Sequence, residues 1–184
     1  MDRRESLKAT GLIIGNVLTP AFLGAFFQKC TTIKESGEDW VPEFFEPEQG
    51  KVLMDAVDLI IPRTDTPGAK DANVHVFIDL FVRDCYNEEQ QDVFKNGLYG
   101  LVKSGFLKFE KTKQLETLQG MEKQSWENNM TGDTSFSKML KSLTVFAYFN
   151  SHEGATKAAE YVAAPGPFQG CIDLKPGQKV AALS

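Results

Sequence analysis

The sequence is poor in the side chains that most often perform catalysis or bind metals. Its 184 residues include only two histidines, His75 and His152, and three cysteines. It has no HExxH zinc motif, no CxxC pair, no Walker-type phosphate loop, no GxGxxG fingerprint and no GxSxG nucleophile turn. The sequence therefore predicts no catalytic, cofactor-binding or metal site in this chain.

An excess of positive charge and long alternating runs are also lacking. The formal net charge is −5, and because residues 1–30 carry four basic and two acidic groups, residues 31–184 carry −7. Such a body argues against nucleic acid as a partner, because nucleic-acid binding needs a basic face. Apolar residues at 42%, with 14 Phe, nevertheless indicate a packed core. We therefore expect an all-α fold, a single compact helical domain of about five to six helices with an N-terminal signal or anchor helix and an irregular C-terminal tail.

Residues 1–30 have the pattern of an export signal. Arg3 and Arg4 precede Leu7 and Lys8, and the apolar run 11–27 follows. An arginine pair before a weakly apolar run is typical of twin-arginine signals, which export folded proteins. The alternative is an amphipathic or membrane-anchoring helix, although this interrupted run is shorter than the roughly twenty residues that span a bilayer.

The downstream end of this signal has three alternatives. Cys30 directly follows the apolar region and could be lipidated, although Lys29 stands where a small residue is usual. Cleavage near Ala25 and retention as an uncleaved anchor are the other two. A lipid chain or an anchor would tether the chain to the membrane. We therefore expect localisation on the periplasmic side of the bacterial inner membrane.

The rest of the chain divides into a linker, residues 31–46, and a helical body, residues 47–184. The linker is expected to dock through the pairs Trp40-Val41 and Phe44-Phe45. Apolar spacing and capping residues place helices at 47–61 and 74–86, from the capping box of Asn87 and Gln90 onward, and from Ser135 or Thr134 onward, with one or two short helices between 106 and 130. Gly154 interrupts the last helix before a short segment, 155–162. Prolines and glycines predict an extended tail from residue 163.

The same spacing predicts which side chains are buried. In 74–86 the apolar stripe includes Phe77, Phe81 and Cys85, and Asp79 and Asp84 are assigned to the solvent face. Close helix packing is the expected role of Gly97, Gly100 and Gly105. The other expected core residues of the later helices include Leu107, Leu115, Leu118, Met121, Trp126, Phe136, Met139, Leu140, Leu143, Phe146, Ala147 and Phe149.

The remaining candidate residues have structural interpretations. His75 is expected to cap or pack a helix start, and His152 cannot work with Glu153 because adjacent helical residues point in different directions. Asp65 lies among turn-forming residues, so an Asx-turn role is favoured over a functional carboxylate. Cys171 in the tail is expected to be exposed, and it could pair with Cys85 or with a cysteine of another subunit.

Three separated motifs resemble the gluconate 2-dehydrogenase subunit 3 family. They are LIIPRTDTPGA at 59–69, continuing into 72–74 and 77–79, AYFNS at 147–151 with Glu153-Gly154, and the tail from Pro165-Gly166 to Gly170-Cys171. The resemblance covers about residues 47–171, with Asn73 and Asn150 as mild departures. Its motif positions are Pro62, Asp65, Pro67, Gly68, Asp79, Phe149 and Gly154.

The resemblance implies a small, helical, non-catalytic subunit of a membrane-bound sugar or sugar-acid dehydrogenase. Its partners would be a large FAD-bearing subunit of the glucose-methanol-choline type and usually a cytochrome c with haem c. The small subunit would carry the twin-arginine signal for a large subunit that lacks one. The alternative is an independent periplasmic ligand-binding protein or enzyme that uses the Asp65 loop and His75.

Overall fold

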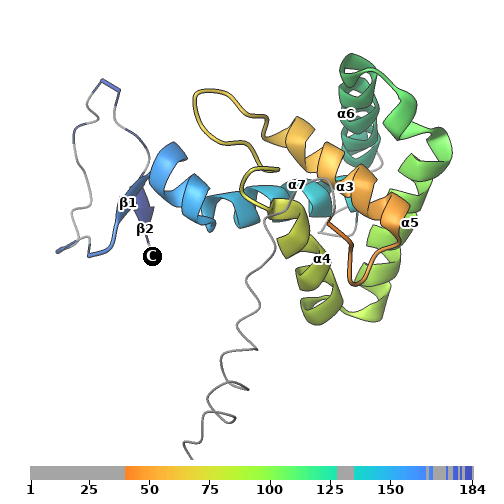
Figure 1. Cartoon of the computed structure of the whole chain (residues 1–184), viewed down its shortest axis with the longest axis horizontal. Helices are drawn as coiled ribbons and strands as arrows, with labels where there is room; N and C mark the ends of the chain where they lie inside the picture. The colour runs from red at the N-terminus through yellow and green to blue at the C-terminus, as the bar shows by residue number, and fades with distance from the viewer. Residues whose placement is uncertain are drawn as a thin grey trace, which may run out of the picture. The chain divides into compact units, whose positions relative to one another are not determined.

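The computed structural model describes residues 40–127 and 135–164, together with 166, 167, 173, 176, 177, 179 and 181–183. The chain divides into two units, Met1–Trp40 and Val41–Ser184. The described part of the second unit is mostly helical, as predicted (Figure 1). Its elements are α3 Pro47–Ile60, α4 Val74–Cys85, α5 Glu88–Ser104, η1 Phe106–Lys108, α6 Lys111–Glu127, α7 Phe136–Phe149, η2 Gly154–Ala158, β1 Glu160–Val162 and β2 Ala181–Leu183.

Local chemistry sets most of the helix ends. Pro47 begins α3, where its missing N–H would have no helical partner. At α5 the predicted capping box forms, because the Asn87 side chain accepts the Gln90 N–H at 2.9 Å and Gln90 accepts the Asn87 N–H at 3.2 Å. Gly105 ends α5 with a φ of 77°, so this glycine serves as a left-handed C-cap rather than as a packing residue. The positions before α4 and α7 are Asn73 and Ser135, but neither side chain makes a capping hydrogen bond.

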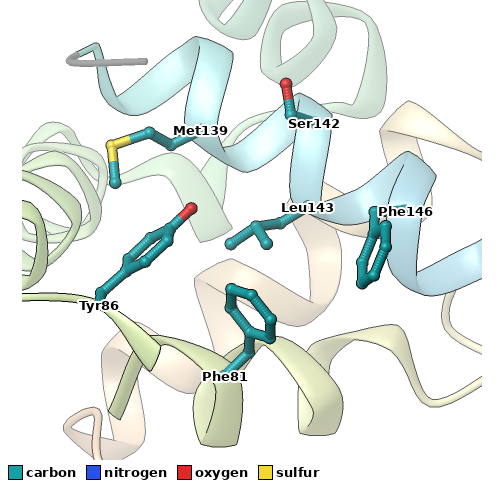
Figure 2. Close-up of a pocket in the computed structure, with 6 residues that line it drawn as sticks. All are labelled: Phe81, Tyr86, Met139, Ser142, Leu143 and Phe146. Atoms are coloured by element: carbon teal, nitrogen blue, oxygen red, sulfur yellow. The ribbon is translucent and has the colours of Figure 1, made fainter. Parts of the chain in front are cut away.

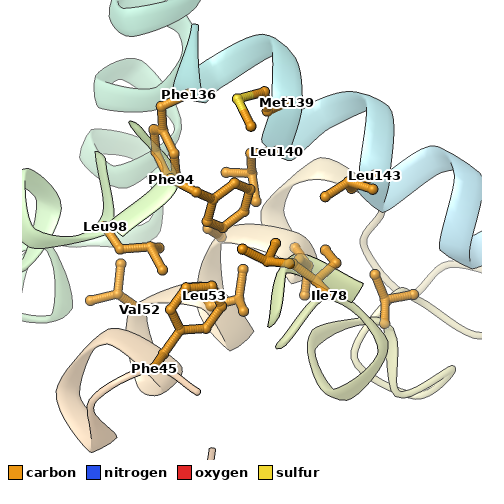
Figure 3. Close-up of a cluster of buried hydrophobic side chains, with 14 of the residues drawn as sticks. Phe45, Val52, Leu53, Ile78, Phe94, Leu98, Phe136, Met139, Leu140 and Leu143 are labelled. Carbon is orange, nitrogen blue, oxygen red and sulfur yellow. The ribbon is translucent and has the colours of Figure 1, made fainter. Parts of the chain in front are cut away.

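The core lies where α3 and α7 pack against α4, α5 and α6, with the segment before α3 closing one side (Figure 3). Phe45 stacks on Phe94 with ring centroids 5.6 Å apart, and Phe94 meets Phe136 edge-on at 5.2 Å. The linker therefore docks through Phe45 and the half-buried Phe44, whereas Val41 is exposed. The buried apolar residues include Val52, Leu53, Ala56, Val57, Ile78, Val82, Leu98, Leu101, Met139, Leu140 and Leu143.

One of the helical glycines has the expected packing role. A Cβ on Gly97 would lie 2.1 Å from Cγ of Phe136, so any side chain there would separate α5 from α7. A Cβ on Gly100 would meet nothing within 4 Å, and the packing role expected there is wrong.

Two short strands correct the prediction of a wholly irregular tail. Within the predicted short segment 155–162, η2 is followed by β1. β1 and β2 pair in parallel, with Glu160 opposite Ala181 and Val162 opposite Leu183. Strands of three residues are too short for alternation to be recognised in a sequence. The expected irregular tail from residue 163 therefore ends in a strand.

Several side chains expected in the core are exposed. They are Phe77, Cys85, Leu107, Leu115, Trp126, Phe146 and Phe149, while Leu118 and Met121 are half-buried. Spacing identifies an apolar stripe but does not say which neighbour covers it. None of the helices that the structure describes between residues 40 and 164 has the length and apolar character needed to cross a bilayer.

Candidate functional site: the signature loop and an aromatic surface

The signature loop, residues 61–73, is closed by hydrogen bonds around Gly68 and Ala69. The Ala69 N–H donates to the Ile61 carbonyl at 2.8 Å, and the Gly68 N–H donates to Oδ2 of Asp71 at 2.8 Å. A Cβ on Gly68 would lie 2.7 Å from the Arg63 nitrogen, so only glycine fits. Arg63 binds both carboxylate oxygens of Asp71 and holds the pKa of Asp71 below its usual value. The loop is therefore a rigid turn.

Asp71 performs the role that the sequence suggested for Asp65. Asp65 and Pro62 are exposed, and the carboxylate that accepts a backbone N–H in this loop belongs to Asp71. Asp71 follows the Pro-Gly pair by three residues, which is the spacing of a side chain that closes a turn. Asp65 is left as a solvent-facing carboxylate.

Tyr148 joins the separated family motifs. Its hydroxyl donates to the carbonyl of Pro67 at 2.6 Å, which ties the signature loop to α7. A Cβ on Gly154 would lie 1.9 Å from the Tyr148 carbonyl oxygen. The Gly154 end of the second motif therefore packs directly against the backbone of Tyr148. Phe149, its neighbour, is 46% exposed. Tyr148 was not among the residues predicted to be functional. Its place inside the AYFNS motif, between the apolar Ala147 and Phe149, was the signal available in the sequence.

Asp79 corrects the sequence prediction, because it is buried and not on a solvent face. Its carboxylate accepts the backbone N–H groups of Glu43 at 2.7 Å and Phe45 at 3.0 Å, with Phe44 at 3.3 Å. These three backbone N–H groups belong to the segment that precedes α3, and they need an acceptor when the segment is folded. By accepting them, Asp79 fixes this segment to α4. Arg83, one turn later, pairs with Glu43 at 2.5 Å. Asp84 is exposed, as predicted.

His75 is a packing residue. It lies in the first turn of α4 with no exposed surface, and burial, with a smaller contribution from Lys70, lowers its pKa from 6.5 to about 4. It is therefore neutral near pH 7. Because His75 is buried whereas Asp65 is exposed, the two do not form one accessible site, and His152 is exposed elsewhere. The part of the chain that the structure describes has no group of His, Cys, Asp and Glu able to hold a metal ion.

An aromatic surface lies along α4 and α7, formed by the exposed Phe77 and Phe146, the half-buried Phe81, and the half-buried Tyr86, which directly follows α4. Phe146 approaches Phe77 and Phe81 with centroid distances of 6.1 and 6.3 Å, and Phe81 meets Tyr86 edge-on at 5.7 Å. Beside these rings is a cavity of about 270 Å³, lined by Phe81, Tyr86, Met139, Ser142, Leu143 and Phe146. In Figure 2, Phe81 and Tyr86 point from the α4 side toward Leu143 and Phe146 of α7.

The family comparison decides what kind of domain carries these features. A family model described as gluconate 2-dehydrogenase subunit 3 matches residues 47–166. The chain belongs to the gluconate 2-dehydrogenase subunit 3 family. No curated protein and no solved structure matches it.

Membership of this family confirms the resemblance seen in the motifs. It also implies that the partner of this chain is a dehydrogenase. The matched range of the subunit 3 domain includes α3 to α7 and β1. It contains the signature loop, Asp79, Tyr148 and Gly154, all of which stabilise the fold. It also contains the aromatic surface, on which the described residues leave Phe77 and Phe146 exposed.

Six candidate residues of this subunit 3 chain lie outside the described residues. They are the export-signal residues Arg3, Arg4, Leu7 and Lys8 and the cysteines Cys30 and Cys171. The pairing of Cys171 therefore stays a prediction. Cys85, its possible partner within the chain, is exposed at the end of α4 and not buried as predicted.

Proposed function

We propose that this chain is the non-catalytic small subunit of a periplasmic FAD-dependent sugar dehydrogenase complex, which escorts the flavoprotein through twin-arginine export and stabilises it. The observation that carries this proposal is the presence, on one chain, of the Arg3-Arg4 export pattern and a subunit 3 domain. A signal of this kind exports folded proteins. A partner bound in the cytoplasm can therefore cross together with the chain that carries the signal.

In this proposal the chemistry belongs to the partners. The large subunit, of the glucose-methanol-choline type, holds FAD and oxidises a hydroxyl of gluconate, of glucose or at C3 of a glycoside. A third subunit with haem c would take the electrons onward. This chain holds no cofactor and stays at the periplasmic face of the inner membrane through an uncleaved anchor or a lipid on Cys30.

A double substitution of Arg3→Lys and Arg4→Lys tests the escort role. It keeps the charge of the signal but removes the arginine pair, so the flavoprotein should remain in the cytoplasm. The measurement is flavoprotein and dehydrogenase activity in periplasmic and cytoplasmic fractions of cells that express both chains. Lys34→Arg, a charge-conserving change outside the signal, is the matched control. Full export of the flavoprotein by the double variant would refute the escort role.

The non-catalytic assignment has its own test. The full-length chain, purified without its partner, should show no flavin absorbance and no sugar oxidation with an artificial electron acceptor. Sugar-dependent reduction of the acceptor by the isolated chain would overturn the assignment and favour the independent enzyme.

A further inference from the structure

The helix α7 has apolar side chains on its exposed face as well as on its inner face. Its inner face carries mostly apolar buried side chains, and its exposed positions are Lys141, Ser142, Val145, Phe146 and Phe149. Lys141, the single charged side chain among these exposed positions, is paired with Glu122 at 2.6 Å. Apolar side chains that gather on one exposed face indicate a surface that a partner covers. The described fold covers one side of α7 only.

The exposed face of α4 extends this apolar area. Phe77, Phe81 and Cys85 follow one another at intervals of four residues and therefore lie along one side of the helix. Phe77 is 39% exposed and Phe146 is 51% exposed, and their rings are 6.1 Å apart. The aromatic surface is therefore a contiguous patch across two helices and not a single exposed apolar residue.

The cavity beside these rings indicates what could enter it. At about 270 Å³ it is smaller than the roughly 300–1,000 Å³ of most cofactor and ligand sites. Of the described residues that line it, Tyr86 and Ser142 supply hydroxyls and none carries a charge. A protruding apolar side chain fits this chemistry, whereas a sugar acid or a nucleotide does not. Buried apolar anchors of this kind dominate the affinity of protein interfaces.

The charges near the aromatic surface distinguish between kinds of partner. Arg83 pairs with Glu43 and Asp84, and Lys141 pairs with Glu122, all within this chain. The surface therefore offers apolar contact, which is typical of permanent complexes, and transient electron-transfer encounters bury less area. A lipid surface is disfavoured, because helices that lie on membranes combine an apolar face with many Lys and Arg, and this chain has a net charge of −5.

We propose that the aromatic surface of α4 and α7 is where the dehydrogenase subunit docks, with one of its apolar side chains in the cavity between Phe81, Tyr86 and Phe146. This inference rests on the proposed function, since it locates the interface of the same complex. The occupant is a permanently bound protein of complementary apolar surface. Family membership indicates that this partner is a dehydrogenase subunit, and the chemistry of the aromatic surface indicates where it binds.

The test compares Phe146→Asp and Phe77→Asp with Tyr99→Asp in the full-length chain, co-expressed with its flavoprotein and purified through a C-terminal tag. Tyr99 is the matched control because it is an exposed aromatic, at 55%, on α5 and outside the aromatic surface. The co-purified flavin should fall at least about tenfold for each Phe variant and stay at the wild-type level for Tyr99→Asp. Unchanged flavin in both Phe variants would overturn the docking site.

The amount of flavoprotein that co-purifies with the wild-type chain distinguishes a failure of this inference from a failure of the proposed function. If the wild-type chain carries no flavoprotein, the proposed function itself fails. If it carries flavoprotein and the Phe variants do too, only the location is wrong. Self-association of the wild-type chain that Phe146→Asp abolishes, or binding to anionic lipid vesicles with the same sensitivity, would assign the surface to a second copy or to a membrane and overturn the inference.

A measurement without substitutions keeps the test valid if the Phe variants fold poorly. Cys85 is exposed on the same side of α4 as Phe77 and Phe81. Its rate of alkylation by a maleimide, followed by peptide mass spectrometry, should fall at least about fivefold when the wild-type chain is in the complex. An equal rate in the free chain and in the complex would show that the partner leaves this side of α4 uncovered.

Discussion

Both sides of α4 mix polar and apolar residues, but in different ways. Its inner side holds the buried Asp79 and His75 beside Val74, Ile78 and Val82, and its outer side presents Phe77 and Cys85 beside Arg83 and Asp84. The same contrast continues on α7, where Tyr148 faces inward and bonds the signature loop while Phe146 faces solvent. On these two helices, buried polar groups add hydrogen bonds between distant segments to the apolar core, and some aromatic side chains remain exposed.

This contrast predicts that stability and partner binding can be separated by substitution. Changes on the inner side should lower the free energy of unfolding, because they remove hydrogen bonds or place charge where it is desolvated. Changes on the outer side should affect unfolding little, because those side chains are already half in water. The four predictions that follow test this separation in the full-length chain.

The largest effect is expected for Asp79→Ala. The substitution leaves the N–H groups of Glu43, Phe44 and Phe45 without their acceptor, and each unsatisfied buried donor costs roughly 1–3 kcal/mol. The free energy of unfolding should fall by at least about 3 kcal/mol, measured by urea denaturation. Asp84→Ala, on the exposed side of the same helix, should change it far less, because exposed ion pairs contribute little to stability. Equal losses in the two variants would contradict the contrast between the sides.

His75 should make stability depend on pH. The unfolded chain protonates this histidine below about pH 6.5, whereas the folded chain does so only below about pH 4. Between these values the unfolded state binds more protons, so stability falls as the pH falls, by up to about 3 kcal/mol. Denaturation curves at several pH values give the dependence, and His75→Leu should show less of it because Leu does not titrate. The same slope in both proteins would mean that His75 is not buried as a neutral side chain.

Removal of the Tyr148 hydroxyl should have an intermediate effect. Tyr148→Phe loses the 2.6 Å hydrogen bond to the Pro67 carbonyl but keeps the ring in place. A single bond of this kind contributes about 1 kcal/mol, and the loss should be about 1.5 kcal/mol with the carbonyl left partly unsatisfied. Amide hydrogen exchange should rise in residues 61–69 first. No change in that loop would show that Tyr148 does not hold it.

The smallest effect on folding is expected for Phe146→Ser. Half of this ring is exposed, so the lost burial should cost less than about 1 kcal/mol. Thermal unfolding of the chain without its partner measures the change. A loss as large as that of Asp79→Ala would place Phe146 in the core and remove the distinction between the two sides.

The helix positions were largely predictable because local chemistry decides them. The capping box of Asn87 and Gln90 and the start at Pro47 each act within a few residues, and the structure places both where the sequence did, while α3 ends at Ile60, one residue before its predicted end. The family motifs were also readable, and the match over residues 47–166 confirms them.

The candidate site was less predictable, because its features depend on contacts between distant residues. The backbone N–H donors that Asp79 accepts lie 34 to 36 residues away, and Tyr148 reaches Pro67 across 81 residues. Spacing within α4 could not distinguish a covered stripe from an uncovered one. It therefore assigned Phe77 and Cys85 to the core and Asp79 to solvent.

By itself, the sequence determined most helix positions, the family and the presence of an export-type pattern, because each of these depends on residues that are neighbours in the chain. The tertiary structure alone decided which side of α4 and α7 is covered. Burial is a property of the surrounding segments, and the segment 43–45 brings backbone donors to Asp79. No segment that the structure describes covers Phe146 to the same extent.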